Sequence, residues 1–230
     1  MKNGSGVEAG RLGVWTGNPP AGEIFKVNGS GFKRVMDLVL AFTVLTFTSP
    51  LLIAIYSLLK IFDPGPALFT QLRVGRDGRT FTVYKFRTMR VDAQERLENM
   101  LAGDPTAANE WAEFQKLKRD PRVTILGRIL RKTSLDELPQ LLNIVRGEMS
   151  VIGPRPVTSG EIHRYGVDYP YYTAVRPGVL GLWQVKGRNC LTYPERVAYD
   201  VQYVKTWSIW QDIKILFLAV PVVLMARGAY

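Results

Sequence analysis

The amino-acid sequence predicts an α+β protein that is mostly helical, with an N-terminal membrane helix, a short β-hairpin and one small domain. An uncharged apolar run over residues 38–59 predicts the membrane helix, because about 20 apolar residues suffice to cross a bilayer. Two alternating apolar runs around a glycine-containing turn at 74–78 predict the hairpin. Helical periodicity in much of the remainder predicts the rest of the domain. We expect a tail over 1–30, the membrane helix over 31–62 and the domain over 63–230.

The composition limits the chemistry. The 230 residues include 30 Lys and Arg against 20 Asp and Glu, a net charge of +10. This excess predicts phosphate groups, an anionic membrane surface or nucleic acid as partners, although it can also serve solubility alone. A single cysteine, Cys190, excludes an internal disulfide, and a single histidine, His163, excludes a His-pair metal site. The sequence also lacks P-loop, dinucleotide-binding, serine-hydrolase and zinc-protease motifs, so carboxylates and cations are expected to carry any chemistry.

The N-terminal tail, residues 1–30, is rich in glycine and has little apolar periodicity. A signal peptide would need an apolar core in this stretch. The pattern therefore predicts a flexible tail.

The membrane run has cations on both sides and a helix-breaking signal at its centre. Its flanks carry Lys26, Lys33 and Arg34 before it, and Lys60, Arg73, Arg76 and Arg79 after it. Because cationic flanks tend to stay cytoplasmic, a spanning helix would have to export one of them. At Ser49-Pro50 the proline removes a backbone donor, and the serine hydroxyl can bond a freed carbonyl. The pattern favours a hairpin that enters and leaves by one face, with a kinked spanning helix as the alternative.

The domain begins with the predicted hairpin and continues with helices. Glycines in the turn at 74–78 are expected to supply positive φ. Thr133 or Ser134 is expected to cap a helix whose first turn holds two acidic residues. The predicted strands are Ala67–Arg73 and Arg79–Phe86, and the predicted helices are Val91–Met100, Ala107–Leu117, Ile125–Leu130 and Leu138–Val145.

The C-terminal third is expected to be rich in loops after Gly153-Pro154, until a final helix. Apolar residues recur there at helical spacing, whereas Asp212 and Lys214 lie off the apolar stripe. The pattern fits an amphipathic helix at the membrane interface with tryptophans at headgroup level. A helix packed on the domain's own core fits almost as well. The stripe consists of Trp207, Trp210, Ile213, Leu216, Phe217 and Val220.

Two adjacent carboxylates, Asp136 and Glu137, give the densest functional signal. They follow Arg131 and Lys132 at a predicted helix start. Neighbouring side chains on a helix diverge by about 100°, so the two can divide roles, one attacking and the other holding a divalent cation or moving a proton. An ordinary acidic first turn, favoured by the helix dipole, is the alternative.

Several stiff turns carry cations that suit phosphate oxygens. Gly153-Pro154-Arg155-Pro156 presents one arginine, and a guanidinium can bind phosphate in a bidentate way. Lys85 and Arg87 lie on one face of a strand, while Arg176 and Arg188 stand among glycines. Each signal is weak alone, but together around the carboxylate pair they make a diphosphate-plus-metal site plausible.

The stretch D-P-R-V-T-I-L-G-R-I-L-R-K-T-S-L-D-E-L-P-Q-L-L-N-I-V-R-G-E-M-S-V-I-G-P-R-P, residues 120–156, closely resembles the bacterial sugar transferase family, the monotopic phosphoglycosyl transferases. K-F-R-T-M at 85–89 and R-P-G-V-L-G-L-W-Q-V-K-G-R-N at 176–189 resemble two further motifs in order. The resemblance covers roughly residues 31–226. The short form and the R-G-A-Y end resemble enzymes that initiate exopolysaccharide synthesis. Leu180 stands where family members commonly have threonine, which makes a polar role there doubtful.

The resemblance implies transfer of a hexose-1-phosphate, of galactose or glucose, from a UDP-sugar to undecaprenyl phosphate at the cytoplasmic face of the bacterial inner membrane. Asp136 would attack, releasing UMP and forming a phosphosugar on the aspartate, and Glu137, with Asp136, would bind Mg²⁺. Ser49-Pro50 matches the break of the family's re-entrant helix, and this match favours the membrane hairpin over the kinked spanning helix. The implied substrate contacts are Lys85, Arg87, Arg131, Arg155, Arg176, Gln184 and Arg188.

Three questions stay open at the level of the sequence. A glycosyltransferase that releases UDP, or a basic membrane-tethered adaptor, is the alternative function. The lipid bilayer is an expected partner and nucleic acid is not, while a homodimer is plausible. The sequence does not name the sugar.

Overall fold

The computed structural model describes residues 31–114, 117, 120–187 and 191–224. The predicted tail, together with Arg188 and Cys190, lies outside the described residues. Within them the protein is mostly helical, with one antiparallel hairpin and a small parallel sheet. The predicted α+β class is confirmed at this level.

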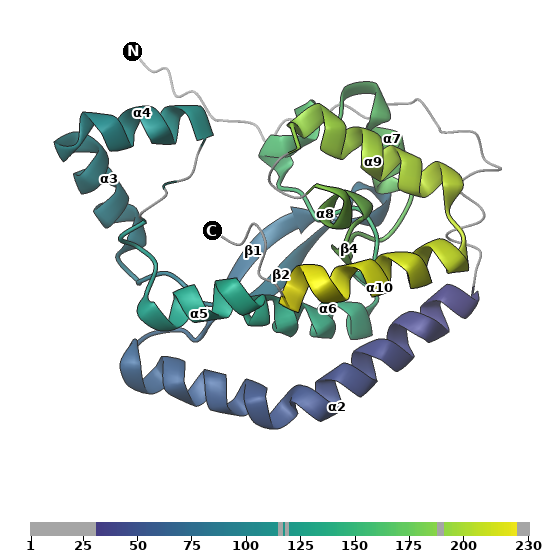
Figure 1. Ribbon diagram of the computed structural model, residues 1–230, viewed down its shortest axis with the longest axis horizontal. Helices are drawn as coiled ribbons and strands as arrows, with labels where there is room; N and C mark the ends of the chain where they lie inside the picture. The colour runs from purple at the N-terminus through teal and green to yellow at the C-terminus, as the bar shows by residue number, and fades with distance from the viewer. Residues whose placement is uncertain (1–30, 115–116, 118–119, 188–190, 225–230) are drawn as a thin grey trace, which may run out of the picture.

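The long apolar helix α2, Gly31–Phe62, runs along one side of the molecule and is bent near its middle (Figure 1). The predicted break at Ser49-Pro50 is a bend within a continuous helix. Pro50 cannot donate to the carbonyl of Thr46, four residues earlier, and the hydroxyl of Ser49 donates to that carbonyl instead, at 2.9 Å. In the described part of the chain, α2 is the helix long and apolar enough to cross a bilayer by length and composition.

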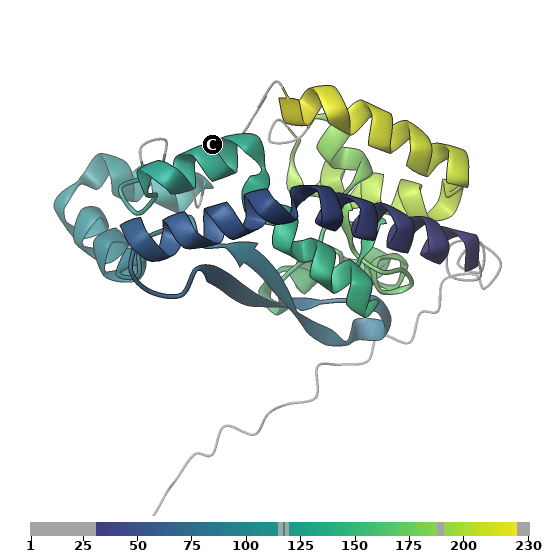
Figure 2. The ribbon, with the colours of Figure 1, turned by 90° about the horizontal axis from the view of Figure 1, so that it is seen from below.

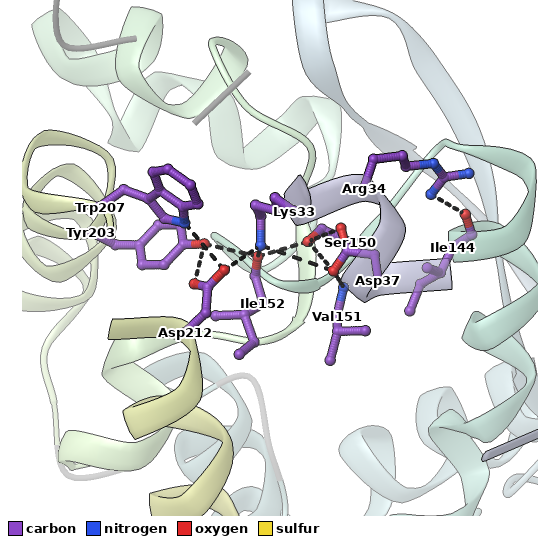
Figure 3. A network of polar contacts seen from close by, with 10 residues as sticks. All are labelled: Lys33, Arg34, Asp37, Ile144, Ser150, Val151, Ile152, Tyr203, Trp207 and Asp212. Atoms are coloured by element: carbon purple, nitrogen blue, oxygen red, sulfur yellow. Dashed lines mark hydrogen bonds and ion pairs between the residues drawn. The ribbon is translucent and has the colours of Figure 1, made fainter. Parts of the chain in front are cut away.

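Both ends of α2 pack on the same body, and Figure 2 shows the helix crossing it between the C-terminal helix α10, Ile209–Leu224, and the β-hairpin. At the N-terminal end, Lys33 donates to Asp212 of α10 at 2.7 Å, and Asp37 accepts hydrogen bonds from Ser150 and from the amide of Val151 (Figure 3). Lys33, one of the cations that flank the apolar run, is thus buried in an ion pair. At the other end, the buried residues Ile55 and Leu59 pack with Ala67, Phe86 and Leu130.

The predicted hairpin is confirmed as β1, Leu68–Val74, paired antiparallel with β2, Thr80–Phe86. The short helix η1, Arg76–Gly78, joins them. Positive φ occurs at Asp77 (59°) and Gly78 (71°), whereas Gly75 is extended. One of the two glycines therefore has the expected role, and an aspartate takes the other left-handed position.

Helices α3, Ala93–Gly103, and α4, Pro105–Phe114, form a pair that projects from the main body (Figure 1). Leu97, Ala107 and Leu117 form their small separate core. The two helices, predicted as Val91–Met100 and Ala107–Leu117, are separated at Gly103-Asp104-Pro105. Asp104 accepts hydrogen bonds from the amides of Thr106 and Ala107 at the start of α4.

Helix α5, Ile125–Thr133, leads into the 3-10 helix η2, Leu135–Gln140, and then α6, Leu141–Arg146. The prediction that Thr133 or Ser134 caps the second helix is confirmed in position only, because Ser134 is the N-cap residue of η2, whose first turn holds Asp136 and Glu137. Thr133 belongs to α5, where its hydroxyl donates to the carbonyl of Ile129. Ser134 ends α5 in a left-handed conformation (φ 57°) and its side chain makes no capping bond.

The region after Gly153-Pro154 contains more helix than predicted. Strand β3, Ser150–Ile152, pairs in parallel with β4, Gly178–Leu180. Helix α9, Tyr193–Thr206, was missed as a helix in a region expected to be loops. The short helices are η3, Ser159–Arg164; η4, Gly166–Asp168; α7, Tyr169–Thr173; and α8, Leu182–Lys186.

The final helix α10, Ile209–Leu224, has two different faces. Ile215 and Ala219 are buried, and Ile215 joins the main core formed with α2, β2, α6, β3 and α9. Trp210 and Phe217 are exposed. Packing of this helix on the domain's own core is thus confirmed for one face, while the other face presents large apolar side chains and its place at a membrane interface stays a prediction. Asp212 is fully buried, which the stripe did not predict.

Candidate active site

The predicted acidic pair opens the 3-10 helix η2, which packs between α5 and β2. Ser134 turns the chain sharply after α5, and Pro139 lies inside η2. A 3-10 helix has three residues per turn, so adjacent side chains diverge by about 120°. The side chains of Asp136 and Glu137 therefore leave η2 in different directions.

Glu137 is held by two cations. The Lys85 ammonium lies 2.6 Å from Glu137 Oε1, and the Arg155 guanidinium lies 3.2 Å from the same oxygen. Burial raises the pKa of Glu137, but attraction to Arg155 and Lys85 outweighs it and lowers the pKa to about 2. Glu137 is therefore ionised throughout the physiological range.

Asp136 has a different environment from its neighbour. Burial, and then repulsion by Glu137, raise the pKa of Asp136 to about 6, although Lys85 and Arg131 favour its charged form. Among the described residues, Asp136 forms no ion pair within 4 Å. Its carboxylate is thus partly desolvated, close to cations and titrating near neutral pH, which suits a nucleophile.

Arg131 is positioned from the end of β2. Its Nε donates to the hydroxyl of Thr88 at 2.9 Å, and α5 approaches Thr88 so closely that a Cβ at Gly127 would overlap the Thr88 carbonyl. Thr88 lies within the K-F-R-T-M motif, and no role was predicted for it. The sequence signal that could have identified Thr88 was its position directly after two cations at the end of a predicted strand.

The structure brings three of the predicted substrate contacts to the acidic pair and places others elsewhere. Lys85, Arg131 and Arg155 surround the pair. Arg87 forms an ion pair with Asp63 at 3.2 Å, and Arg176 donates to the carbonyl of Gly147 at 2.8 Å. Gln184 accepts from the amide of Gly181 at the start of α8, at 2.6 Å. Binding roles for these residues and for Arg188 stay predictions.

The donor set fits a magnesium ion that also binds substrate. Both cationic contacts of Glu137 use Oε1, and the adjacent Asp136 adds a second carboxylate. Mg²⁺ prefers oxygen ligands and commonly takes one or two carboxylates plus substrate phosphates. Across the described ranges no group of three or more His, Cys, Asp and Glu could form a cage of protein ligands. The two carboxylates thus match the partial set of ligands that such an ion takes from protein.

This acidic pair, with its cations and apolar helix, lies within residues 28–226, which match the family model described as bacterial sugar transferase. The chain belongs to this family, and the resemblance inferred from its motifs is confirmed. It is 50% identical over 199 residues to the undecaprenyl-phosphate galactose phosphotransferase of Salmonella typhimurium, over 86% of this chain and 41% of that protein.

Two further relatives differ in length. The exopolysaccharide production protein ExoY of Rhizobium meliloti is 46% identical over 202 residues, 88% of this chain and 89% of that protein. The UDP-glucose:undecaprenyl-phosphate glucose-1-phosphate transferase of Escherichia coli is 39% identical over 206 residues, 86% of this chain and 41% of that protein. The chain thus spans about two fifths of the Salmonella and Escherichia relatives and most of ExoY.

Proposed function

We propose that the protein transfers a hexose-1-phosphate, of galactose or glucose, from a UDP-sugar to undecaprenyl phosphate and releases UMP. The relatives whose names describe this transfer support the substrate pair. Relatives named for exopolysaccharide production support a place at the first membrane step of exopolysaccharide synthesis. The observation that carries the chemistry is Asp136, a desolvated carboxylate without an ion pair among the described residues, beside cations and an ionised Glu137.

The proposed reaction has two displacements at one phosphorus atom. An Asp136 oxygen attacks the β-phosphorus of the UDP-sugar, and the bond from that phosphorus to the bridging oxygen breaks, so UMP leaves with the electron pair. A phosphosugar then remains on Asp136. An oxygen of undecaprenyl phosphate attacks the same phosphorus, the Asp136 carboxylate leaves, and undecaprenyl-diphospho-sugar forms. Lys85, Arg131 and Arg155 offset the phosphate charge in both steps.

The carboxylates of Asp136 and Glu137 would hold Mg²⁺. When bound, this ion supplies positive charge against the diphosphate of the donor. Lys85 and Arg155 keep Glu137 ionised, and therefore in the form that binds a cation.

The long helix supports attachment to the cytoplasmic face of the inner membrane by a re-entrant helix. Both ends of α2 pack on the same body, while its middle is exposed, with Phe47 at 82%. A spanning helix would carry its ends to opposite sides of the bilayer. Exposed apolar residues on α10 and α5 support placement of these helices at the interface; they are Trp210, Phe217, Ile125 and Ile129.

The test incubates the detergent-solubilised chain with Mg²⁺, undecaprenyl phosphate and a panel of UDP-sugars, and identifies the released nucleotide. Wild type should release UMP, and Asp136→Asn should lower the rate at least about a thousandfold. The matched control, Asp92→Asn, removes an exposed carboxylate that pairs with Arg96 and should leave the rate unchanged. Release of UDP would favour the simple glycosyltransferase. No nucleotide from any donor would favour the adaptor.

A further inference from the structure

Arg73, near the end of β1, donates hydrogen bonds to three separate acceptors. Its guanidinium donates to the side chain of Gln71 at 2.6 Å and to the carboxylate of Glu161 in η3 at 3.2 Å. It also donates to the carbonyl of Pro156 at 3.1 Å. A guanidinium presents its donors in a rigid planar fork, so three acceptors fix its orientation. Arg73 therefore links the β-hairpin to the chain segment that carries Arg155.

Backbone contacts hold the same segment beside Arg73. The amide of Val74 donates to the carbonyl of Val157 at 2.9 Å, and the two residues form an isolated β-bridge. The buried hydroxyl of Tyr172 donates to the carbonyl of Val74 at 2.6 Å and accepts from the amide of Val157 at 3.1 Å. These three residues belong to one buried apolar cluster. The end of β1 and the chain that follows Arg155 are thus packed together.

The turn that carries Arg155 has little conformational freedom of its own. Pro154 and Pro156 flank Arg155, and a proline fixes its own φ and favours an extended conformation at the residue before it. The carbonyl of Pro154 accepts a hydrogen bond from the amide of Gly178 at 2.7 Å, which holds the turn from its other side. Because the turn is stiff, a shift of the Pro156 carbonyl moves Arg155 as well.

We propose that the guanidinium fork of Arg73 positions Arg155 against Glu137 for the first displacement, an inference that rests on the proposed function. The Arg155 guanidinium lies 3.2 Å from Glu137 Oε1. Burial lowers the pKa of Arg73, attraction to Glu161 raises it, and repulsion by Arg155 lowers it again, so the two guanidinium groups lie close enough to repel each other. Arg73 acts on the reaction through Arg155 and is therefore a positioning residue.

A double-mutant cycle on the full chain in detergent separates positioning from a purely structural role. The assay measures single-turnover release of UMP from the UDP-sugar without acceptor, which reports the first displacement. Arg73→Met should slow this release at least about tenfold in the wild-type background. In an Arg155→Met background the same change should slow it less than about twofold, because no guanidinium is left to be misplaced. Arg79→Met, which removes an exposed cation from the same hairpin, should leave the rate unchanged.

Arg73→Lys tests the fork separately from the charge, and it keeps the proposal testable if Arg73→Met does not fold. Lysine retains the positive charge but replaces the planar fork with a single ammonium. We expect it to slow UMP release by a factor close to that of Arg73→Met, again only where Arg155 is present. Release at the wild-type rate would show that charge alone suffices and would overturn the proposal. Thermal unfolding identifies the variants that are folded at the assay temperature.

The outcomes separate failure of this inference from failure of the proposed function. A wild type that releases no UMP would overturn the proposed function, and the positioning role of Arg73 with it. If wild type releases UMP but the Arg73 variants slow it by the same factor with and without Arg155, the two residues act independently. The positioning role alone would then be overturned, and the proposed function would stand.

Discussion

At the scale of single residues, Asp136 and Glu137 differ more in their surroundings than in their chemistry. Two cations meet one oxygen of Glu137, whereas Asp136 is desolvated and forms no ion pair among the described residues. Their pKa values are pushed apart, to about 2 and about 6. This separation assigns the permanent charge to Glu137 and leaves Asp136 as the more reactive carboxylate.

The raised pKa of Asp136 predicts the pH dependence of UMP release. In the proposed mechanism only the carboxylate form of Asp136 attacks, and this form is present above about pH 6 and lost as pH falls through about 6. Below that value we expect the single-turnover rate to fall about tenfold per pH unit, and above it to level off. Single-turnover release of UMP between pH 5 and 8 measures this.

Glu137→Gln provides the diagnostic variant for this pH profile. It removes the negative neighbour that raises the pKa of Asp136, so the midpoint should move to lower pH even where the rate is reduced. An unchanged midpoint would contradict the assignment of the titration to Asp136.

At the scale of elements, local sequence patterns predicted the β-hairpin and the acidic segment. The features that the sequence did not predict, among them helix α9, depend on contacts between distant residues. The hairpin could be predicted because alternation and a glycine turn are local patterns. Helix α9 was missed because Asp200, a carboxylate, occupies one of its buried positions and interrupts the apolar stripe. Its capping box at Thr192 and Glu195 was readable in the sequence. Arg87 pairs with Asp63, which is distant in sequence, and Arg176 bonds the backbone carbonyl of Gly147. A sequence motif reveals neither partner.

The close approach of α5 to the end of β2 predicts an unusual response to Gly127→Ala. In an ordinary helix interior this change stabilises by roughly 0.5–1 kcal/mol. Here the added Cβ would overlap the backbone of Thr88, so we expect destabilisation of about 1–3 kcal/mol and slower UMP release as Arg131 shifts. Thermal unfolding in detergent and the single-turnover assay measure both effects.

Gly103→Ala is the control for this prediction, because a Cβ at Gly103 in α3 meets no atom within 4 Å. If Gly127→Ala were as stable and as active as Gly103→Ala, the packing of α5 on Thr88 would not position Arg131.

At the scale of the whole molecule, a buried polar network joins the membrane helix to the C-terminal helix and to β3 (Figure 3). Lys33 bonds both Asp212 and the carbonyl of Ile152, and Tyr203 and Trp207 also donate to Asp212. Lys33 and Asp212 are 179 positions apart in sequence, so no local pattern identified the pair. Chain segments at the two ends of the described region are thereby locked together.

This network predicts a large effect of Lys33→Met on stability. The change leaves two buried carboxylates, Asp37 and Asp212, without their cation, and such a loss destabilises by roughly 3–5 kcal/mol. Thermal unfolding of the detergent-solubilised protein should show a much lower Tm. Arg96→Met, which breaks an exposed ion pair with Asp92, should leave the Tm nearly unchanged. Equal Tm values for the two variants would show that the buried pair does not anchor α2.

The anchoring of both ends of α2 also predicts its topology in the membrane. The helix of 32 residues is about 48 Å long, enough to cross a hydrocarbon core of about 30 Å. Length therefore permits spanning, but packing of both ends on one body requires both to stay on the same side of the bilayer, which we propose is the cytoplasmic side. Single cysteines at Phe32 and Phe62, both exposed, in a Cys190→Ser background should react with an impermeant maleimide in inverted vesicles and not in spheroplasts.

Pro50→Ala tests whether the bend maintains this arrangement. It restores the backbone donor to Thr46 and should straighten the helix, so that a fraction of the molecules insert across the bilayer and one of the two cysteines reacts in spheroplasts. The network around Lys33 opposes this change, because spanning would pull one end of α2 from the body. Combining Pro50→Ala with Lys33→Met should therefore increase the spanning fraction beyond either change alone. Labelling of either end in spheroplasts of the unaltered helix would contradict the re-entrant topology.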